Sequence, residues 1–199
     1  MENIQFQEAL LTLPPNLNRY DYHRIVSDQH SRGAPPAPRN YIYDIRPLGK
    51  QITACTMRSH NLPSMFNPQT FHLSASEGQE VTGSVVLTFV KRRTEKPRSE
   101  KHKGKIILSD VKDPETFVHE RMANCGLNIT SLPQGVSLTK IPVNKGKNII
   151  PVVFGRVNFT ANITDLQKLG DTYLSGVGRS KTFGFGMIYL PELVKEGAV

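Results

Sequence analysis

The strongest chemical signal in this sequence lies between residues 176 and 186. The segment reads GVGRSKTFGFG, so four glycines share it with two cationic side chains. Glycine permits positive φ angles and lets a ligand approach the backbone closely. Successive backbone N–H groups can then surround a phosphate, and the cations add charge. The segment predicts a phosphate-binding loop whose contact residues are Gly176, Gly178, Arg179, Ser180, Lys181, Gly184 and Gly186.

This glycine-rich loop matches neither common nucleotide-binding motif. The P-loop pattern GxxxxGK[ST] is absent, and a dinucleotide fingerprint would follow a strand, whereas this segment is expected to follow a helix. A phosphate backbone is therefore the ligand that the loop fits best. A glycine-rich turn that binds no ligand is the alternative.

A second cationic segment covers residues 91–105 and reads KRRTEKPRSEKHKGK. Its lysines and arginines outnumber its two glutamates, and it offers nothing for a core to bury. We expect a basic hairpin tip or loop that contacts phosphates, with a solvated loop as the alternative. The residues expected to bind are Lys91, Arg92, Arg93, Lys96, Arg98, Lys101, Lys103 and Lys105.

The composition agrees with a polyanionic partner. The formal net charge is +8 and the pI about 9.6, a balance that ribosomal proteins share. Cys55 and Cys125 stand far apart without metal-ligand spacing, so we expect buried free thiols, with neither a disulfide framework nor a zinc site. We expect no metal and no cofactor. No apolar run approaches the roughly 18 residues that span a bilayer, and acidic residues near the start do not suit a signal peptide. We therefore expect a cytoplasmic protein without membrane contact.

Strand and helix signals alternate in a repeated order. Asn18 and Asp113 are good helix caps, and β-branched and aromatic runs predict strands between the helices. The expected strands are 3–13, 40–47, 51–60, two within 70–93, 136–143, 148–161 and 182–190, and the expected helices are 18–30, 113–125 and 162–174. Each half approaches the order β-α-β-β-α-β, with the second helix of the first half weak or missing.

This order predicts an α+β fold of tandem ferredoxin-like (RRM-like) domains. We place the first domain at 1–109, with the basic arm at 91–105. The second domain takes residues 110–199 and carries the glycine-rich loop.

The motifs together resemble a known group, the RAMP superfamily of repeat-associated CRISPR proteins. The glycine-rich loop is the feature specific to that superfamily. Along nearly its whole length the chain more narrowly resembles the CasE family, the repeat-processing endoribonucleases of type I-E CRISPR systems. The resemblance rests on Tyr20-x-x-His23, the hairpin PRNYIYDIRP with QITACTMRSHNLP, the strand LTFVKRR before the basic segment, and the final helix, loop and strand.

The resemblance implies a metal-independent endoribonuclease that binds the hairpin of a CRISPR repeat. Such an enzyme cuts precursor crRNA at the 3′ side of the stem and stays on its product beside other subunits of a surveillance complex. The RNA's own 2′-hydroxyl is the nucleophile, so the protein supplies acid–base groups and positive charge. Within this reading the basic segment contacts the stem, because A-form RNA is recognised mainly by shape.

The same resemblance implies that His23 and Tyr20 are the catalytic residues. Histidine exchanges protons near neutral pH, and a tyrosine three positions earlier projects from the same face of a helix. The direction of proton transfer stays open. His30, seven positions later, and the neighbouring Tyr22 are rival candidates. The remaining histidines are expected to be structural or solvated: His60, His72, His102 and His119.

Two other classes of protein fit part of the sequence. A non-catalytic RNA-binding RAMP subunit of a CRISPR complex would show the same charge and the same loop. A nucleotide-binding metabolic enzyme is disfavoured by the basic segment and by the lack of acidic ligands for a ribose or a metal.

Overall fold

The computed structural model describes residues 2–32, 40–94, 106–145 and 148–197. Its first half forms one sheet and one long helix. The elements are β1 (Glu2–Leu13), α1 (Arg19–Ser31), β2 (Tyr41–Leu48), β3 (Ile52–Ser59), the short 3₁₀ helix η1 (Ser64–Phe66) and β4 (Gln69–Ala75). Their strands run antiparallel in the order β4-β1-β3-β2, which is the order of a ferredoxin-like unit. Only η1 stands where the second helix of the unit would be, as the sequence predicts.

The second half repeats this order with longer insertions. It contains β5 (Glu80–Thr88), α2 (Pro114–Ala123), β8 (Leu127–Ser131), β10 (Asn148–Ile163), α3 (Leu166–Ser175) and β11 (Ile188–Tyr189). Their strands are ordered β11-β5-β10-β8, so the position of each strand in the unit matches its counterpart in the first half. The expected tandem ferredoxin-like fold is confirmed by this shared order.

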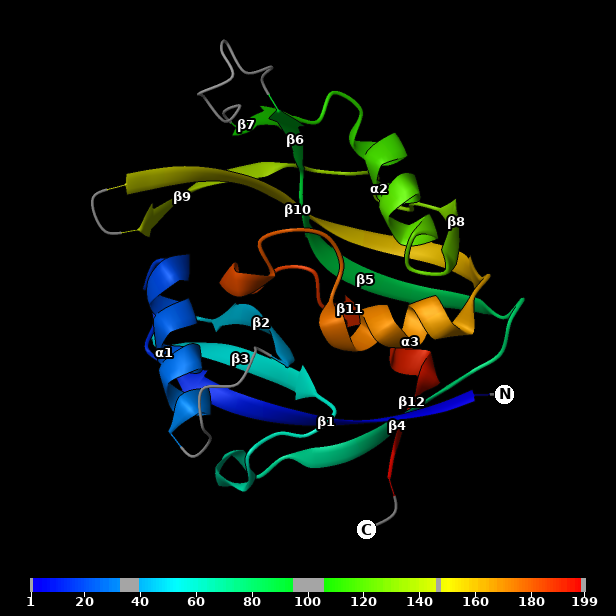
Figure 1. The fold of residues 1–199 in the computed structure, drawn as a ribbon, viewed down its shortest axis with the longest axis horizontal. Helices are drawn as coiled ribbons and strands as arrows, with labels where there is room; N and C mark the ends of the chain where they lie inside the picture. The colour runs from blue at the N-terminus through cyan, green and yellow to red at the C-terminus, as the bar shows by residue number, and fades with distance from the viewer. Residues whose placement is uncertain (1, 33–39, 95–105, 146–147, 198–199) are drawn as a thin grey trace, which may run out of the picture.

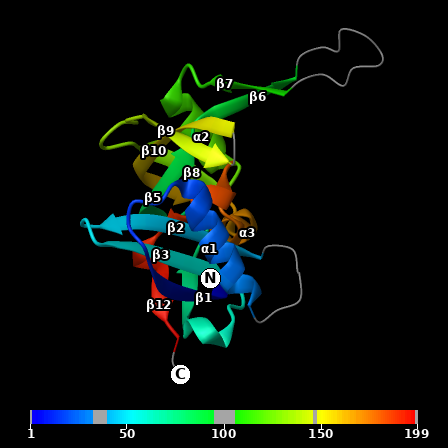
Figure 2. The same ribbon diagram turned by 90° about the vertical axis from the view of Figure 1, so that its left-hand side faces the viewer.

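The remaining elements extend the two units. β6 (Val90–Thr94) and β7 (Ile106–Asp110) pair with each other, and β9 (Thr139–Lys145) pairs with β10. In both views β9 and β10 lie between α1 and the β6–β7 pair (Figures 1 and 2). After β11 the chain forms the 3₁₀ helix η3 (Pro191–Leu193) and then β12 (Val194–Glu196), which returns to pair with β4 at the edge of the first sheet.

The sheets divide the chain at a different place from the expected boundary. A boundary after residue 109 assigns β5 to the first half, yet β5 pairs with β10 and β11 in the second sheet. The run SVVLTFVKR predicts a strand, but strand propensity does not say which partner the strand takes. On the pairing we propose that the first unit ends at residues 76–79 and that β12 crosses back to it, in place of domains at 1–109 and 110–199.

Two segments near the loop differ from the sequence prediction. The third helix begins at Leu166 with Asp165 as its cap, because Asn162 and Ile163 complete the ladder of β10 with β8. The strand expected at 182–190 is limited to β11, since positive φ angles at Gly184 and Gly186 interrupt an extended backbone.

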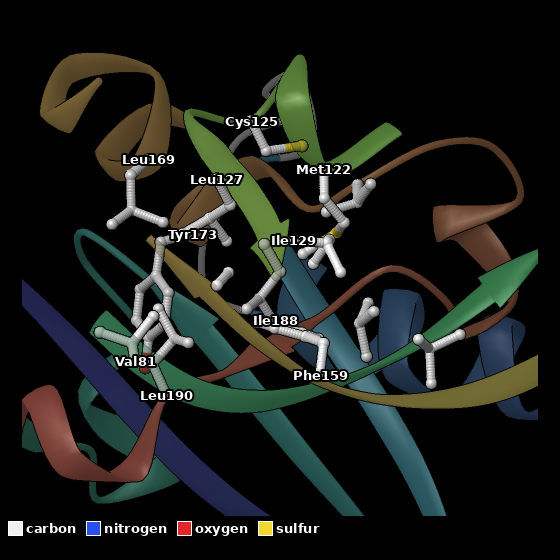
Figure 3. Close-up of a cluster of buried hydrophobic side chains, with 14 of the residues drawn as sticks. Val81, Met122, Cys125, Leu127, Ile129, Phe159, Leu169, Tyr173, Ile188 and Leu190 are labelled. Atoms are coloured by element: carbon white, nitrogen blue, oxygen red, sulfur yellow. The ribbon is translucent and has the colours of Figure 1, made fainter. Parts of the chain in front are cut away.

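The hydrophobic core joins the two halves. On one face of the first sheet α1 packs through Tyr22 and Val26. The other face meets α3, where Phe6 lies edge-on to Tyr173 at 5.3 Å. Figure 1 shows α3 between the two sheets, and Figure 3 shows Tyr173 within a cluster that includes Leu169, Ile188 and Phe159. The halves therefore share the core cluster around α3, whereas α1 packs on a separate cluster.

Both cysteines are buried and free, as expected. Burial raises the pKa of the Cys55 thiol to about 12, so this thiol stays protonated and unreactive at neutral pH. No helix in the described ranges is long and apolar enough to cross a membrane.

Candidate functional site

Helix α1 places Tyr20 and His23 on the side that faces the second half of the chain. Asn18 caps the helix, and its side-chain oxygen accepts hydrogen bonds from the backbone N–H of Tyr20 at 2.8 Å and of Asp21 at 3.2 Å. Tyr22 and Val26, four residues apart, face the first sheet. This orientation leaves Tyr20 and His23 on the flank of the helix, both half-buried.

Tyr20 and His23 contact each other and the glycine-rich loop. Their ring centroids are 6.3 Å apart, and the ring of His23 stands edge-on to Phe183 at 6.5 Å. Tyr20 also packs against a small cluster of buried side chains from the second half, which consists of Val86, Val143, Val152 and Phe185. The structure thus brings two residues of the first half beside the loop of the second half.

The rival residues on α1 have structural contacts. The hydroxyl of Tyr22 donates a 3.0 Å hydrogen bond to the carbonyl of Pro14 and lies 2.9 Å from the hydroxyl of Thr53. His30 lies about 10 Å along the helix axis from His23. Its ring packs on Tyr41 at 4.4 Å and near Phe66 at 6.5 Å. Neither rival therefore contacts the loop in the way that His23 does.

The glycine-rich loop reaches α1 by crossing the edge of the first sheet. β2 is the edge strand, and neighbouring residues on a strand point to opposite faces. Gly176 lies against Ile42 on one face, whereas Gly184 lies against Tyr43 on the other. The hydroxyl of Tyr43 donates a 2.5 Å hydrogen bond to the carbonyl of Thr182. Figure 1 shows the resulting path from the end of α3 toward α1.

Three of the four loop glycines are required by packing. Each of the four has a positive φ, between 74° at Gly178 and 88° at Gly186. A Cβ at Gly176 would lie 1.9 Å from the Cδ1 of Ile42, and one at Gly186 would lie 2.2 Å from the carbonyl oxygen of Val177. A Cβ at Gly184 would lie 2.9 Å from the ring of Tyr43. At Gly178, by contrast, it would meet no atom of the described residues within 4 Å, so this glycine borders open space.

The polar residues of the loop differ in exposure. Arg179 is exposed, and its backbone carbonyl accepts a 3.1 Å hydrogen bond from the hydroxyl of Thr88 at the end of β5. Ser180 and Lys181 are half-buried at the start of the 3₁₀ helix η2 (Lys181–Phe183), which contacts α1. The ammonium of Lys181 donates a 3.3 Å hydrogen bond to the carbonyl of Gly176. Arg179 is thus the loop cation that projects furthest into solvent.

Arg19 is a site residue that the sequence analysis missed. Its guanidinium donates a 3.4 Å hydrogen bond to the carbonyl of Phe183 and stacks over the ring of Phe185 at 4.8 Å. Burial lowers the pKa of Arg19, and the carboxylate of Asp44 acts in the opposite direction. A guanidinium stays protonated at neutral pH all the same, so Arg19 adds a fixed positive charge between α1 and the loop. Its contacts join residues 164 positions apart, a separation that leaves no local pattern in the sequence.

A cavity of about 610 Å³ borders the loop at Lys181 and Thr182. The exposed side chain of His60 also lines this cavity. The sequence analysis treated His60 as structural or solvated, so its place beside the loop is new. The exposed His119 lies on α2, and His72 lies on β4 beside Gly197.

The structure describes only part of the basic segment. Strand β6 contains Lys91, Arg92 and Arg93. The other expected contacts lie outside the described residues: Lys96, Arg98, Lys101, Lys103 and Lys105. Among the residues that the structure does describe, no group of three or more His, Cys, Asp or Glu side chains is placed to hold a metal ion.

Several solved structures to which this chain is similar are of CRISPR proteins. A chain of Thermus thermophilus Cse3, bound to an RNA representing a pre-cleavage complex, aligns with a TM-score of 0.69 at 17% identity, covering 94% of this chain and 98% of that one. Cas6e from Escherichia coli K-12 aligns with a TM-score of 0.63 at 11% identity, covering 92% and 98%. A chain of a CRISPR RNA-guided surveillance complex aligns at 0.59 and 21%, covering 91% and 97%. These likenesses confirm the tandem ferredoxin-like fold.

Sequence comparison gives the family. No curated protein sequence matches the chain significantly. A family model described as "CRISPR associated protein" matches residues 18–191, a range that holds α1, the strands of the second sheet, three strands of the first sheet and the glycine-rich loop. Because this match covers most of the chain, the protein belongs to that family of CRISPR-associated proteins.

Proposed function

We propose that this protein is a metal-independent endoribonuclease that binds the CRISPR repeat hairpin and cleaves precursor crRNA at the 3′ side of the stem. The cut uses the 2′-hydroxyl of the RNA as the nucleophile and leaves a 2′,3′-cyclic phosphate. The enzyme then stays bound to the crRNA as a subunit of a ribonucleoprotein complex. Its catalytic residues are His23 and Tyr20.

The observation that carries this proposal is the contact between His23 and the glycine-rich loop. A group that exchanges protons near neutral pH lies edge-on to Phe183, and Lys181 and Arg179 are on the same short loop. An acid or base beside a phosphate-binding segment is the pair of functions that RNA cleavage without a metal requires. The two parts come from different halves of the chain, and the fold brings them together.

The proposed reaction needs two proton transfers and stabilisation of negative charge on the phosphorus. A base removes the proton of the 2′-hydroxyl, whose oxygen attacks the neighbouring phosphorus. The bond from phosphorus to the 5′-oxygen breaks, and an acid returns a proton to that oxygen. His23 performs one of these transfers, and Tyr20 assists it. Arg179, Lys181 and the fixed charge of Arg19 stabilise the extra negative charge on the phosphorus in the transition state.

The proteins of similar fold support this choice of partner. The Thermus thermophilus protein is bound to an RNA that represents a pre-cleavage complex, and two other chains belong to RNA-guided surveillance complexes. We extend these partners to the present chain, whose net charge of +8 suits an RNA ligand.

A second candidate is an RNA-binding subunit of a CRISPR complex that does not cleave. The packing of Gly176, Gly184 and Gly186 is compatible with it, because these glycines are needed for the fold whether or not the loop takes part in chemistry. The same charge and the same partners would then serve binding alone.

Incubation of the protein with the repeat hairpin of its own locus in EDTA separates the two candidates. We expect one defined cut, with a 2′,3′-cyclic phosphate on the upstream product as measured by mass spectrometry. A hairpin with a single 2′-deoxynucleotide at the cut position serves as the matched control and should bind without being cut. Tight binding of both hairpins without any cleavage would support the binding subunit instead.

A further inference from the structure

Arg58 is a buried cation that the proposed chemistry does not use. It lies on β3 on the face toward the second half, and only 1% of its surface is exposed. Glu8, directly opposite on β1, accepts hydrogen bonds from its Nε at 2.8 Å and its Nη2 at 2.7 Å. Since burying a charge is costly, a residue so placed needs every one of its donors occupied.

The remaining nitrogen of Arg58 bonds to both ends of the glycine-rich loop. Nη1 donates to the carbonyl of Tyr173 at 3.2 Å and to the carbonyl of Ile188 at 2.8 Å. Tyr173 is in the last turn of α3, where carbonyls lack partners within the helix and the helix dipole is negative. Ile188 is on β11, the edge strand of the second sheet. The loop begins after the first carbonyl and ends before the second.

Aromatic rings hold the guanidinium in this place. It stacks over the ring of Tyr173 at 3.7 Å and lies 5.2 Å from the ring of Phe6. Burial raises the pKa of Tyr173 to about 12, so its ring faces the guanidinium as a neutral phenol. The planar fork of the guanidinium therefore has one orientation, fixed by Glu8 on one side and the two carbonyls on the other.

The first sheet links this contact to the proposed catalytic residue. Arg58 projects from one face of the sheet, and α1 packs on the other face through the cluster that includes Tyr22, Cys55 and Met57. The loop is tied separately to the second half, because the N–H of Gly186 donates a 2.8 Å hydrogen bond to the carbonyl of Val86. Arg58 thus joins the base of the loop to the sheet on which α1, the helix of His23, packs.

We propose that Arg58 is a positioning residue, which holds the glycine-rich loop closed at its base and so fixes the loop relative to His23. The inference rests on the proposed function for its effect on cleavage, and on the geometry alone for its effect on the loop. Loss of the contact should loosen the loop without removing any group that touches RNA.

A double variant, Glu8→Gln with Arg58→Met, tests the proposal. Removing both charges leaves no unpaired buried ion, so the fold should survive. The control is Arg46→Met, which breaks the neighbouring ion pair of 2.9 Å and keeps the carboxylate of Asp44 that acts on Arg19. Arg46 stacks on Tyr189 at 4.2 Å but makes no bond to Tyr173 or Ile188 among the described contacts.

Amide hydrogen exchange and single-turnover cleavage give two readouts. In the double variant we expect exchange at Val177 and Gly186 to be at least about tenfold faster, because the loop opens more often. The cleavage rate at saturating protein should fall roughly 10- to 100-fold, since small misplacements of reacting groups are costly. The dissociation constant should change by less than about fivefold, because most phosphate contacts persist. The control should resemble the wild type in all three measurements.

Unchanged exchange at the loop in the double variant would overturn the proposal. If exchange rises while the wild-type protein itself fails to cut the repeat hairpin, the positioning role stands and the proposed enzyme function fails. Should the double variant not fold, Arg58→Lys carries the same test. An ammonium can pair with Glu8 but lacks the fork that reaches two carbonyls, so faster loop exchange is again expected and unchanged exchange again overturns the proposal.

Discussion

Tyr20 and His23 differ from the other polar residues of α1 in the side chains that they contact. Tyr22 is fixed by Pro14 and Thr53, whereas Tyr20 and His23 lie beside a loop that comes from the other half of the chain. A Tyr-x-x-His pattern by itself is short, and the assignment came from a family resemblance. The structure adds a physical reason to prefer this pair, because it places them beside the loop that we propose binds phosphate.

Replacing His23 by alanine should separate binding from chemistry. Loss of a positioned acid or base should lower the single-turnover cleavage rate by roughly 10²- to 10⁴-fold, while affinity for the repeat stays within a few fold. Tyr20→Phe should give a smaller loss of the same kind, because its ring still packs against the second half. The rates are measured at saturating protein with radiolabelled hairpin.

His30→Ala is the control on the same helix, since the described ring contacts of His30 are with Tyr41 and Phe66, whereas the ring of His23 meets Phe183 of the loop. It should cut normally. If His30→Ala is inactive and His23→Ala is active, the proposed catalytic residue is wrong. If both variants cut normally, the Tyr-x-x-His assignment itself is wrong.

At the scale of elements, local sequence predicts what forms but not what pairs. The caps at Asn18 and Asp113 predict the starts of α1 and α2 because a side-chain oxygen within three residues satisfies a backbone N–H. The partner of β5 and the bonds of Arg58 to Tyr173 and Ile188 depend on residues more than 60 positions away, which no local pattern records. The sequence therefore predicts the tandem fold and the loop, whereas Arg19 and Arg58 require the structure.

Two glycines of the loop should differ in how much stability the protein loses when each is replaced by alanine. At Gly176 the new Cβ meets Ile42 and φ is positive, so Gly176→Ala should cost roughly 2–4 kcal/mol of unfolding free energy from strain and overpacking. Gly178 borders open space, so Gly178→Ala should cost only about 1 kcal/mol. Urea unfolding measures both values.

Affinity for the repeat hairpin should show the reverse order if RNA approaches the loop at Gly178. Although it destabilises the fold least, Gly178→Ala should weaken binding more than the alanine variants of the other three glycines, because the methyl group stands where the phosphate would pass. Equal affinity of Gly178→Ala and the wild type would favour the alternative of a turn without a ligand.

At the scale of the whole molecule, the two ferredoxin-like units are not independent. One core cluster contains Phe6 and Leu73 from the first sheet together with Val85, Phe159 and Tyr173 from the second half. The chain also crosses back, because β12 pairs with β4 after the second unit is complete. A site assembled from α1 and the glycine-rich loop benefits from this coupling, since relative motion of the halves would separate His23 from Phe183.

We therefore expect one cooperative unfolding transition, and a variant in the shared core should destabilise both halves at once. Phe6 is fully buried and contacts Tyr173 across the junction, so Phe6→Ala should cost about 3–5 kcal/mol. Pulsed hydrogen exchange in urea, read by mass spectrometry on peptides from β3 and β10, should show both peptides shifting to the same lower midpoint. Leu10→Ala on the same strand is the control, because Leu10 is 70% exposed and should shift neither peptide. A shift confined to the β3 peptide would mean that the halves unfold separately, and the coupling that we assign to the shared core would then be too weak to hold the site together.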